Sequence, residues 1–142
     1  MGMIRMVAVG LCLLAYSGCG PSAPNLPPVS GVVTVDGKPR NLITVILKPD
    51  AAAGNAAMHE PRGCTDDEGR YTVRSSIVEG APAGKYKVGL MMLDPEHGAT
   101  GTPAVAPFNA RYANPDTSGL TIEVSPDPAQ DAYDFHIPKL SP

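Results

Sequence analysis

The sequence predicts an all-β protein: a seven-stranded antiparallel β-sandwich that follows an N-terminal signal helix. Three observations predict it. Apolar residues fall in short, often alternating runs, and none of these runs keeps a helical period over three turns. The 142 residues include 16 prolines and 15 glycines, which punctuate the chain between the runs. Seven such runs separated by turns are most simply accommodated in two antiparallel sheets packed face to face.

The N-terminal segment has the pattern of an export signal. Arg5 is the only charge before the apolar run from Met6 to Tyr16, and the small residues Ser17 and Gly18 follow it. A membrane-spanning helix needs about 20 apolar residues, and Gly20-Pro21 ends this run too early. We therefore expect residues 1–18 to be a lipoprotein signal peptide that is removed on export.

Cys19 is the expected lipidation site. Its place after two small residues resembles the bacterial lipobox, in which the cysteine is diacylated and becomes the first mature residue. Tyr16 departs from that pattern, which has an aliphatic residue there, so cleavage without lipidation stays open. Because stable anchoring takes more than one acyl chain, a diacylated Cys19 would hold the protein to a membrane, facing the periplasm or the cell exterior. Residues 19–28 read as a Pro-rich spacer.

The domain is expected to span residues 29–140, and its first two strands are the plainest. Val29–Val35 is rich in β-branched residues and ends at the turn signal Asp36–Pro39. Leu42–Leu47 is aliphatic and ends at Lys48-Pro49. The stretch from Asp50 to Met58 contains Gly54-Asn55 and is expected to be a loop, although a short helix is an alternative.

The next runs predict a tight hairpin. Gly63–Asp66 and Arg70–Val73 flank Asp67-Glu68-Gly69, where the glycine suits a positive φ and the Asp carboxylates suit hydrogen bonds from nearby backbone amides. A turn at Ala81–Gly84 then leads into Lys85–Met92, which alternates charged and apolar residues as a half-buried strand does.

The last two predicted strands lie beyond a long Gly/Pro-rich loop, Asp94–Pro107, which could carry recognition. They are Gly119–Val124 and Ala132–Ile137. Both combine β-branched or aromatic residues with polar ones at alternate positions, which predicts strands with one buried face.

Charge and cysteine content narrow the classes of function. The chain has 11 Lys and Arg against 14 Asp and Glu, a net charge of −3, and no run of like charges, so no nucleic-acid partner is expected. Cys12 leaves with the signal and Cys19 is acylated, which leaves Cys64 as a single thiol. A lone cysteine in a strand is expected to be a small buried hydrophobe. If Cys19 is not lipidated, a Cys19–Cys64 bridge becomes an alternative.

Three segments together resemble the carboxypeptidase regulatory-like domain: Val29–Pro39, Thr65–Tyr71 and Gly84–Val88. Arg111–Leu120 also resembles a segment common in small bacterial lipoproteins that carry this domain. The resemblance covers nearly all of the chain from Val29 to Ile137. It implies a transthyretin-like, Ig-like sandwich that serves as a non-catalytic accessory module outside the cytoplasm.

No motif for catalysis or metal binding stands out, so the chain is expected not to be an enzyme and to need no metal or cofactor. His59-Glu60 is followed by Pro61-Arg62-Gly63 and lacks the second histidine of a zinc-protease motif. A calcium-binding loop aligned on Asp66–Gly69 would have unsuitable residue types at its first and last ligand positions. His59, His97 and His136 share no ligand spacing. The alternative is a small transthyretin-like hydrolase, without the Tyr-Arg-Gly-Ser terminus of that family, or a metal carrier.

One loop is the candidate binding loop, with Arg111, Tyr112 and Asn114 as its candidate residues. An Arg and a Tyr beside a Pro-stiffened turn could form a contact patch for an unknown envelope protein or glycan. The module could instead scaffold a larger assembly by pairing edge strands. The alternative is structural: Tyr112 plugs the end of the sandwich, while Asn114-Pro115-Asp116 turns the chain into the next strand.

Overall fold

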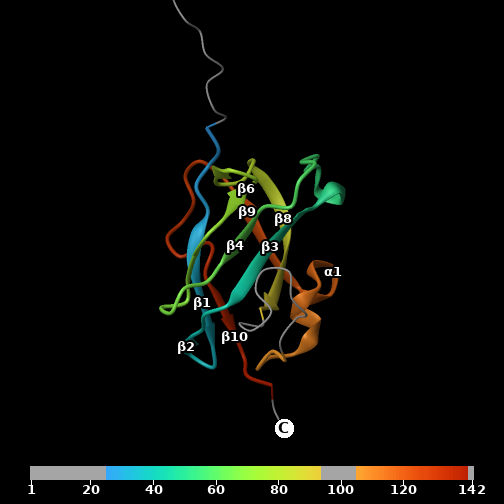
Figure 1. Ribbon diagram of the computed structural model, residues 1–142. Helices are drawn as coiled ribbons and strands as arrows, with labels where there is room; N and C mark the ends of the chain where they lie inside the picture. The colour runs from blue at the N-terminus through green and yellow to red at the C-terminus, as the bar shows by residue number, and fades with distance from the viewer. Residues whose placement is uncertain (1–24, 94–104, 141–142) are drawn as a thin grey trace, which may run out of the picture.

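A computed structural model describes residues 25–93 and 105–140 of the chain and shows two packed β-sheets (Figure 1). The all-β sandwich predicted from the sequence is confirmed. The signal peptide at 1–18, Cys19 and most of the 94–107 loop lie outside the described residues. Among the residues that are described, no helix is long and apolar enough to cross a membrane.

The smaller sheet has four strands built around β1 (Ser30–Val35). β10 (Phe135–Ile137), β2 (Lys38–Pro39) and β5 (Arg70–Thr72) all pair with β1. The turn between β1 and β2 has positive φ at both Asp36 (54°) and Gly37 (73°). Consecutive left-handed residues give a two-residue turn whose twist matches that of the flanking strands, which is why the Asp-Gly signal predicted it well.

The larger sheet has six strands, and β3 and β8 form its longest pairing. In spatial order they are β7 (Val78–Glu79), β6 (Arg74–Ser75), β4 (Arg62–Cys64), β3 (Ile43–Pro49), β8 (Gly84–Met92) and β9 (Leu120–Val124). β3 and β8 pair over seven residues, from Ile43–Met92 to Pro49–Tyr86. The long predicted strands are therefore confirmed, while the described residues divide into more and shorter strands than the seven expected.

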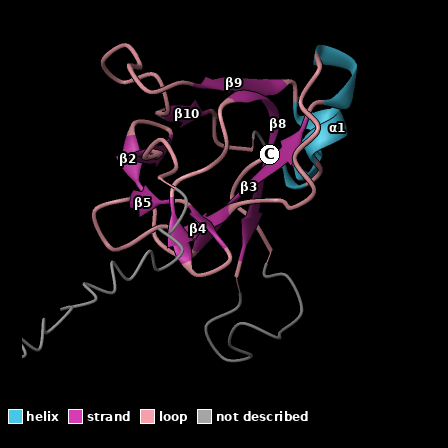
Figure 2. Ribbon diagram, turned by 90° about the horizontal axis from the view of Figure 1, so that it is seen from above, coloured by secondary structure: helices cyan, strands magenta, loops and turns pink. Residues whose placement is uncertain are grey.

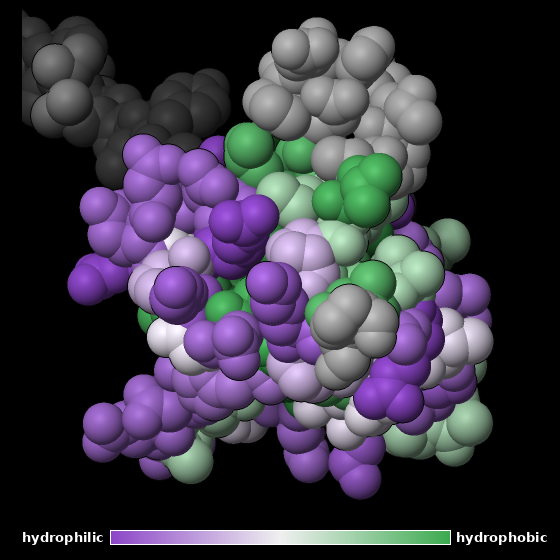
Figure 3. Space-filling view, turned by 90° about the horizontal axis from the view of Figure 1, so that it is seen from below, coloured by the Kyte–Doolittle hydropathy of each residue, from purple (hydrophilic) through white to green (hydrophobic). Residues whose placement is uncertain are grey.

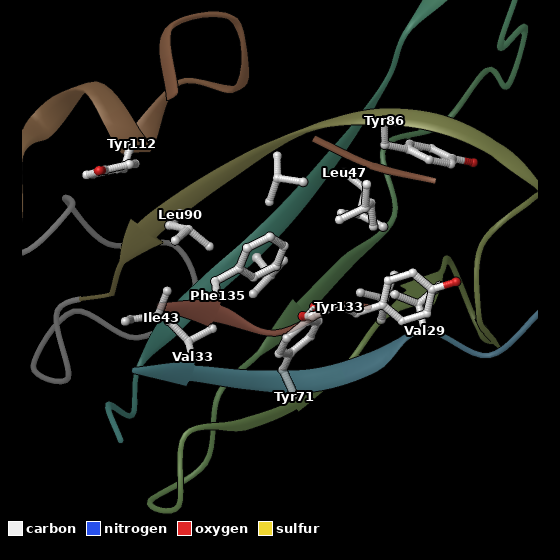
Figure 4. Packing of buried hydrophobic residues seen from close by; sticks show 14 of the residues in the cluster. Val29, Val33, Ile43, Leu47, Tyr71, Tyr86, Leu90, Tyr112, Tyr133 and Phe135 are labelled. Carbon is white, nitrogen blue, oxygen red and sulfur yellow. Dashed lines mark hydrogen bonds between the residues drawn. The ribbon is translucent and has the colours of Figure 1, made fainter. Parts of the chain in front are cut away.

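The core fills the space between the sheets (Figure 4). In β3 the alternate residues Ile43, Val45 and Leu47 are fully buried, and they lie opposite Met92, Leu90 and Val88 of β8. Because successive side chains of a strand point to opposite faces, this alternation sends one face of each sheet inward. The opposite face of β3 and β8 is free to carry other segments of the chain.

The predicted 63–73 hairpin is only partly right. Its turn forms, since the Asp66 amide donates to the Arg70 carbonyl at 2.9 Å and Gly69 has φ 71°. However, the two arms enter different sheets: β4 pairs with β3, and β5 pairs with β1. Beyond that turn, the two sides of the predicted hairpin meet again as paired strands at Arg62 and Arg74, where the chain after β5 has crossed to the larger sheet as β6.

One pairing departs from the antiparallel expectation. β10 runs parallel to β1, with Phe135 beside Val33 and Ile137 beside Val35. Period-two patterning predicts that a strand exists but does not give the direction of its neighbour. The described residues also contain the short helices η1 (Ala51–Ala53), η3 (Ala110–Ala113) and α1 (Pro115–Ser118).

Candidate functional site

The candidate binding loop lies in residues 108–119, which we call the 108–119 segment and which contains η3 and α1. Two aromatic rings anchor it. Phe108 is 2% exposed and Tyr112 is 6% exposed, and their rings meet edge to face with centroids 6.2 Å apart. Both belong to the main hydrophobic cluster. The Tyr112 side chain is therefore buried in the core, as expected if Tyr112 has a structural role in this loop.

Arg111 lies over the outside of that anchor. Its Cζ atom is 4.8 Å from the Tyr112 ring centroid, and its Nη2 donates to the Tyr112 hydroxyl at 3.1 Å. Asn109 begins the turn by accepting the Arg111 amide at 3.0 Å. The Arg111 residue is exposed, so a cation is held against a buried ring while it faces solvent.

Asn114 has a capping role. Its Oδ1 accepts the Asp116 amide at 2.9 Å, and Pro115 follows it at the first helical position. Asn is a favoured cap because its side-chain oxygen satisfies an amide that the first turn leaves unpaired, and Pro has no amide to satisfy. Gly119, at φ 75°, ends α1 in the left-handed conformation. The Asn114 side chain is thus committed to local structure.

Phe108 and Tyr112 reach into the core, whereas Ala113 and α1 pack on the outer face of the larger sheet. A Cβ atom on Gly89 would lie 2.9 Å from Pro115 Cδ and 3.1 Å from the Ala113 carbonyl oxygen, so only glycine lets these residues approach β8 so closely. The Ser118 hydroxyl donates to the Val88 carbonyl at 2.5 Å, which fastens the end of α1 to the same strand.

Two lysines hold α1 from the sheet side. Lys48 and Lys87 are direct cross-strand neighbours, and both donate to the Asp116 carboxylate, Lys87 at 3.2 Å. The hydrogen bonds from Lys48 and then Lys87 lower the pKa of Asp116, and the bond to Asp116 raises the pKa of Lys48. All three side chains are well exposed, so water screens the attraction.

Cys64 corrects an expectation. It was expected to be buried, but it is exposed. Along β4, Arg62 and Cys64 face outward while Gly63 is buried, because the interior position lies against the backbone of Thr72, where a Cβ would come within 2.5 Å of the carbonyl oxygen. Partial burial raises the pKa of the Cys64 thiol. A raised pKa leaves less thiolate at neutral pH, which disfavours a role as a nucleophile.

The remaining sequence candidates lie apart. His59 is exposed, the Nδ1 of His136 lies 2.7 Å from the Thr34 hydroxyl, and His97 is outside the described residues. Among the described residues, no three His, Cys, Asp or Glu side chains gather as metal ligands would. The expectation for Asp66 is confirmed, since its Oδ1 accepts the amides of Glu68 at 3.0 Å and Arg70 at 2.8 Å.

Sequence reasoning missed the ion cluster of Lys48, Lys87 and Asp116. These residues are far apart in the chain, and only the pairing of β3 with β8 makes the lysines neighbours. The available signal was the alternation of Lys85 and Lys87 with apolar residues, because it places Lys87 on the outer face of its strand. Seen from the end that carries the C-terminus, the surface of the described residues is largely hydrophilic, with a group of apolar residues toward one side (Figure 3).

Comparison with known proteins identifies no relative: no protein-family model, no curated protein and no solved structure matches the chain.

Proposed function

We propose that the protein is a lipid-anchored, non-catalytic module of the cell envelope that binds a protein or glycan partner through the 108–119 segment. The carboxypeptidase regulatory-like resemblance and the export pattern of residues 1–19 support this proposal from the sequence. On the structural side, the two-sheet architecture is of the kind that the resemblance implies.

The observation that carries the proposal is the Arg111–Tyr112 pair. Arg and Tyr are enriched at the residues that dominate binding energies. Here the ring is buried and the guanidinium is held 4.8 Å above it, so less side-chain freedom would be lost when a partner binds. The hydrogen bond from the Ser118 hydroxyl at the end of α1 to the Val88 carbonyl holds the segment against β8. This is a preorganised, exposed cation on a rigid support.

The anchor is tested by the intact mass of the protein recovered from membranes of the producing cell. A chain that starts at Cys19 and carries a diacylglycerol adduct is expected. Replacing Cys19→Ser should move the protein from the membrane to the soluble fraction. An unmodified N-terminus elsewhere in the chain, with unchanged membrane recovery of the Cys19→Ser variant, would contradict the anchor.

The binding role is tested with the full chain in its own envelope. A photoreactive residue at the exposed position Ala110 should give a reproducible adduct with one protein, or the protein should co-sediment with purified cell-wall glycan. Arg111→Ala should remove that signal, and Arg111→Lys should weaken it because lysine lacks the planar fork. Arg70→Ala, at an exposed arginine on β5, is the matched control. Equal signals from the Arg111→Ala and Arg70→Ala variants, or no signal in either assay, would refute the role.

A further inference from the structure

The larger sheet ends in a free edge at β9. The other strands at the sheet margins are shorter, with three residues in β10 and two each in β2 and β7, whereas β9 has five. β9 pairs with β8 on one side, and none of the described strands pairs with its other side (Figure 2). A free strand edge presents backbone donors and acceptors that another strand can pair with.

The hydrogen bonds of β8 show which backbone groups of β9 face outward. The Lys85 carbonyl accepts the Asp50 amide at 3.0 Å, so Lys85 turns its backbone toward β3. Backbone direction alternates along an antiparallel strand, so Tyr86 turns toward β9, where it is paired with Ile122. The backbone groups of Thr121 and Glu123 therefore point away from the sheet.

Little occupies this edge among the described residues. The Tyr133 hydroxyl lies 3.5 Å from the Glu123 carbonyl, long for such a bond, and accepts the Ser125 amide at 3.3 Å. Both Thr121 and Glu123 are exposed residues. A new strand along β9 would replace these two long contacts of the Tyr133 hydroxyl and would leave the pairing with β8 intact.

The residue pattern of β9 is complementary to itself. If Ile122 lay opposite Ile122 of a second, antiparallel copy, Thr121 would face Glu123 of that copy, and each such pair would exchange two backbone hydrogen bonds. Glutamate would then never lie directly opposite glutamate. Each Glu123 would keep its own neighbour Lys85, and each Thr121 its own neighbour Lys87, so each outer row would read Lys87, Thr121, Glu123, Lys85 with no two carboxylates side by side.

The inner face of the same pairing is apolar throughout. Ile122 is 7% exposed and Val124 1%, and Leu120 packs against the core cluster. In this register Leu120 would lie opposite Val124 of the second copy. The inward-facing side chains of β9 on both sides of the junction would therefore all be aliphatic.

We infer that the protein forms a twofold dimer in which the β9 strands of two copies pair in antiparallel fashion and join their larger sheets. This inference goes beyond the proposed function and does not depend on lipidation of Cys19. The occupant of the edge is a second copy because the Thr121–Glu123 register keeps the two Glu123 carboxylates from lying opposite each other and joins the apolar faces of the two strands.

The test is sedimentation velocity of the full chain in a non-ionic detergent over a concentration series. The wild type should show a monomer–dimer equilibrium. Thr121→Lys should tighten the dimer and Thr121→Glu should weaken it, each by roughly 2- to 30-fold, because two symmetric pairs with Glu123 form per dimer. Within one copy Thr121 neighbours Lys87, so Thr121→Lys should destabilise the monomer and Thr121→Glu should stabilise it. These directions are opposite to those expected for the dimer, so an effect on dimerisation can be told from an effect on folding.

A second variant tests the backbone itself. Thr121→Pro removes an outward amide that β8 does not use, so the fold should survive and the dimer should be lost, whereas Thr121→Ser should dimerise as the wild type does. Circular dichroism checks the fold. A wild type that stays monomeric at every concentration, a dimer unaffected by Thr121→Pro, or charge variants that shift in the reverse directions would each overturn the inference.

Discussion

Tyr71 shows how a single buried polar group is accommodated in this small core. Its side chain is 3% exposed, and its hydroxyl donates to the Tyr133 carbonyl at 2.5 Å. The ring stacks on Phe135 with centroids 6.2 Å apart. Burial, followed by the nearby Asp134 charge, raises the pKa of Tyr71 far above its ordinary value. The hydroxyl therefore stays protonated and acts as a fixed donor between strand β5 and the approach to β10.

Tyr71→Phe is expected to lower the free energy of unfolding by about 1–3 kcal/mol, because the buried Tyr133 carbonyl loses its donor while the ring stays in place. Chemical denaturation measures it. Tyr86→Phe is the matched control, since its hydroxyl donates to the Pro82 carbonyl at 2.8 Å in a partly buried setting and should cost less. A Tyr71→Phe variant as stable as the wild type would show that this bond contributes nothing net.

Cys64 gives a second prediction at this scale. The thiol is exposed but its pKa is raised by partial burial. Alkylation of Cys64, followed by mass mapping, should therefore have a pH–rate midpoint above that of a cysteine in an unstructured peptide. The Cys64→Ser chain is the blank. A midpoint at or below the peptide value would mean that a nearby positive charge outweighs the burial.

At the scale of elements, α1 is too short to be stable alone, since isolated helices below about 12 residues are marginal in water. It persists because Asn114 and Gly119 cap its ends, Ser118 bonds to β8, and the Asp116 carboxylate meets two lysines. The candidate binding segment is therefore held by contacts from the sheet. Substitutions that remove those contacts should make Arg111 more mobile even though Arg111 itself is unchanged.

The Asp116 ion cluster should contribute stability that depends on pH. The folded-state pKa of Asp116 is lowered, so its contribution is present above the unfolded-state pKa of an aspartate and is lost as the pH falls through the lower folded value. Asp116→Asn should be slightly less stable than the wild type near neutral pH, and the two should converge in acid. Denaturation curves at several pH values check this, and a constant difference across them would refute it.

At the scale of the whole molecule, β10 closes the fold by pairing in parallel with β1, far from it in the chain. Tyr133, Phe135 and Ile137 are buried around this junction. The Pro27 carbonyl, just before β1, accepts the Ala81 amide at 3.1 Å, so the chain that leads into β1 is fastened to the domain. A free spacer of residues 19–26 would reach roughly 25 Å if it is extended like polyproline.

In the inferred dimer the two spacers would leave from opposite ends, because antiparallel pairing reverses strand direction. Both could meet one membrane if the strands lay parallel to its surface.

Deleting residues 132–142 should abolish cooperative folding, because it removes a sheet partner of β1 together with three buried apolar side chains. Thermal and chemical unfolding followed by circular dichroism would show the loss of a transition. Deleting only residues 139–142 is the control. It removes one backbone bond, from the Leu140 amide to the Pro107 carbonyl at 2.8 Å, and should leave the domain folded. A cooperative transition in the longer deletion would show that β10 is dispensable.

The sequence by itself determined the local features: the sandwich class, the long strands β1, β3, β8 and β9, the Asp36-Gly37 turn and the amide-accepting Asp66. These depend on alternation and turn chemistry, which act over a few residues. Tertiary structure alone decided which sheet β5 joins, the parallel direction of β10, the outward face of Cys64 and the meeting of Lys48, Lys87 and Asp116. Those outcomes depend on which distant strands become neighbours, and period-two patterning is the same for any neighbour.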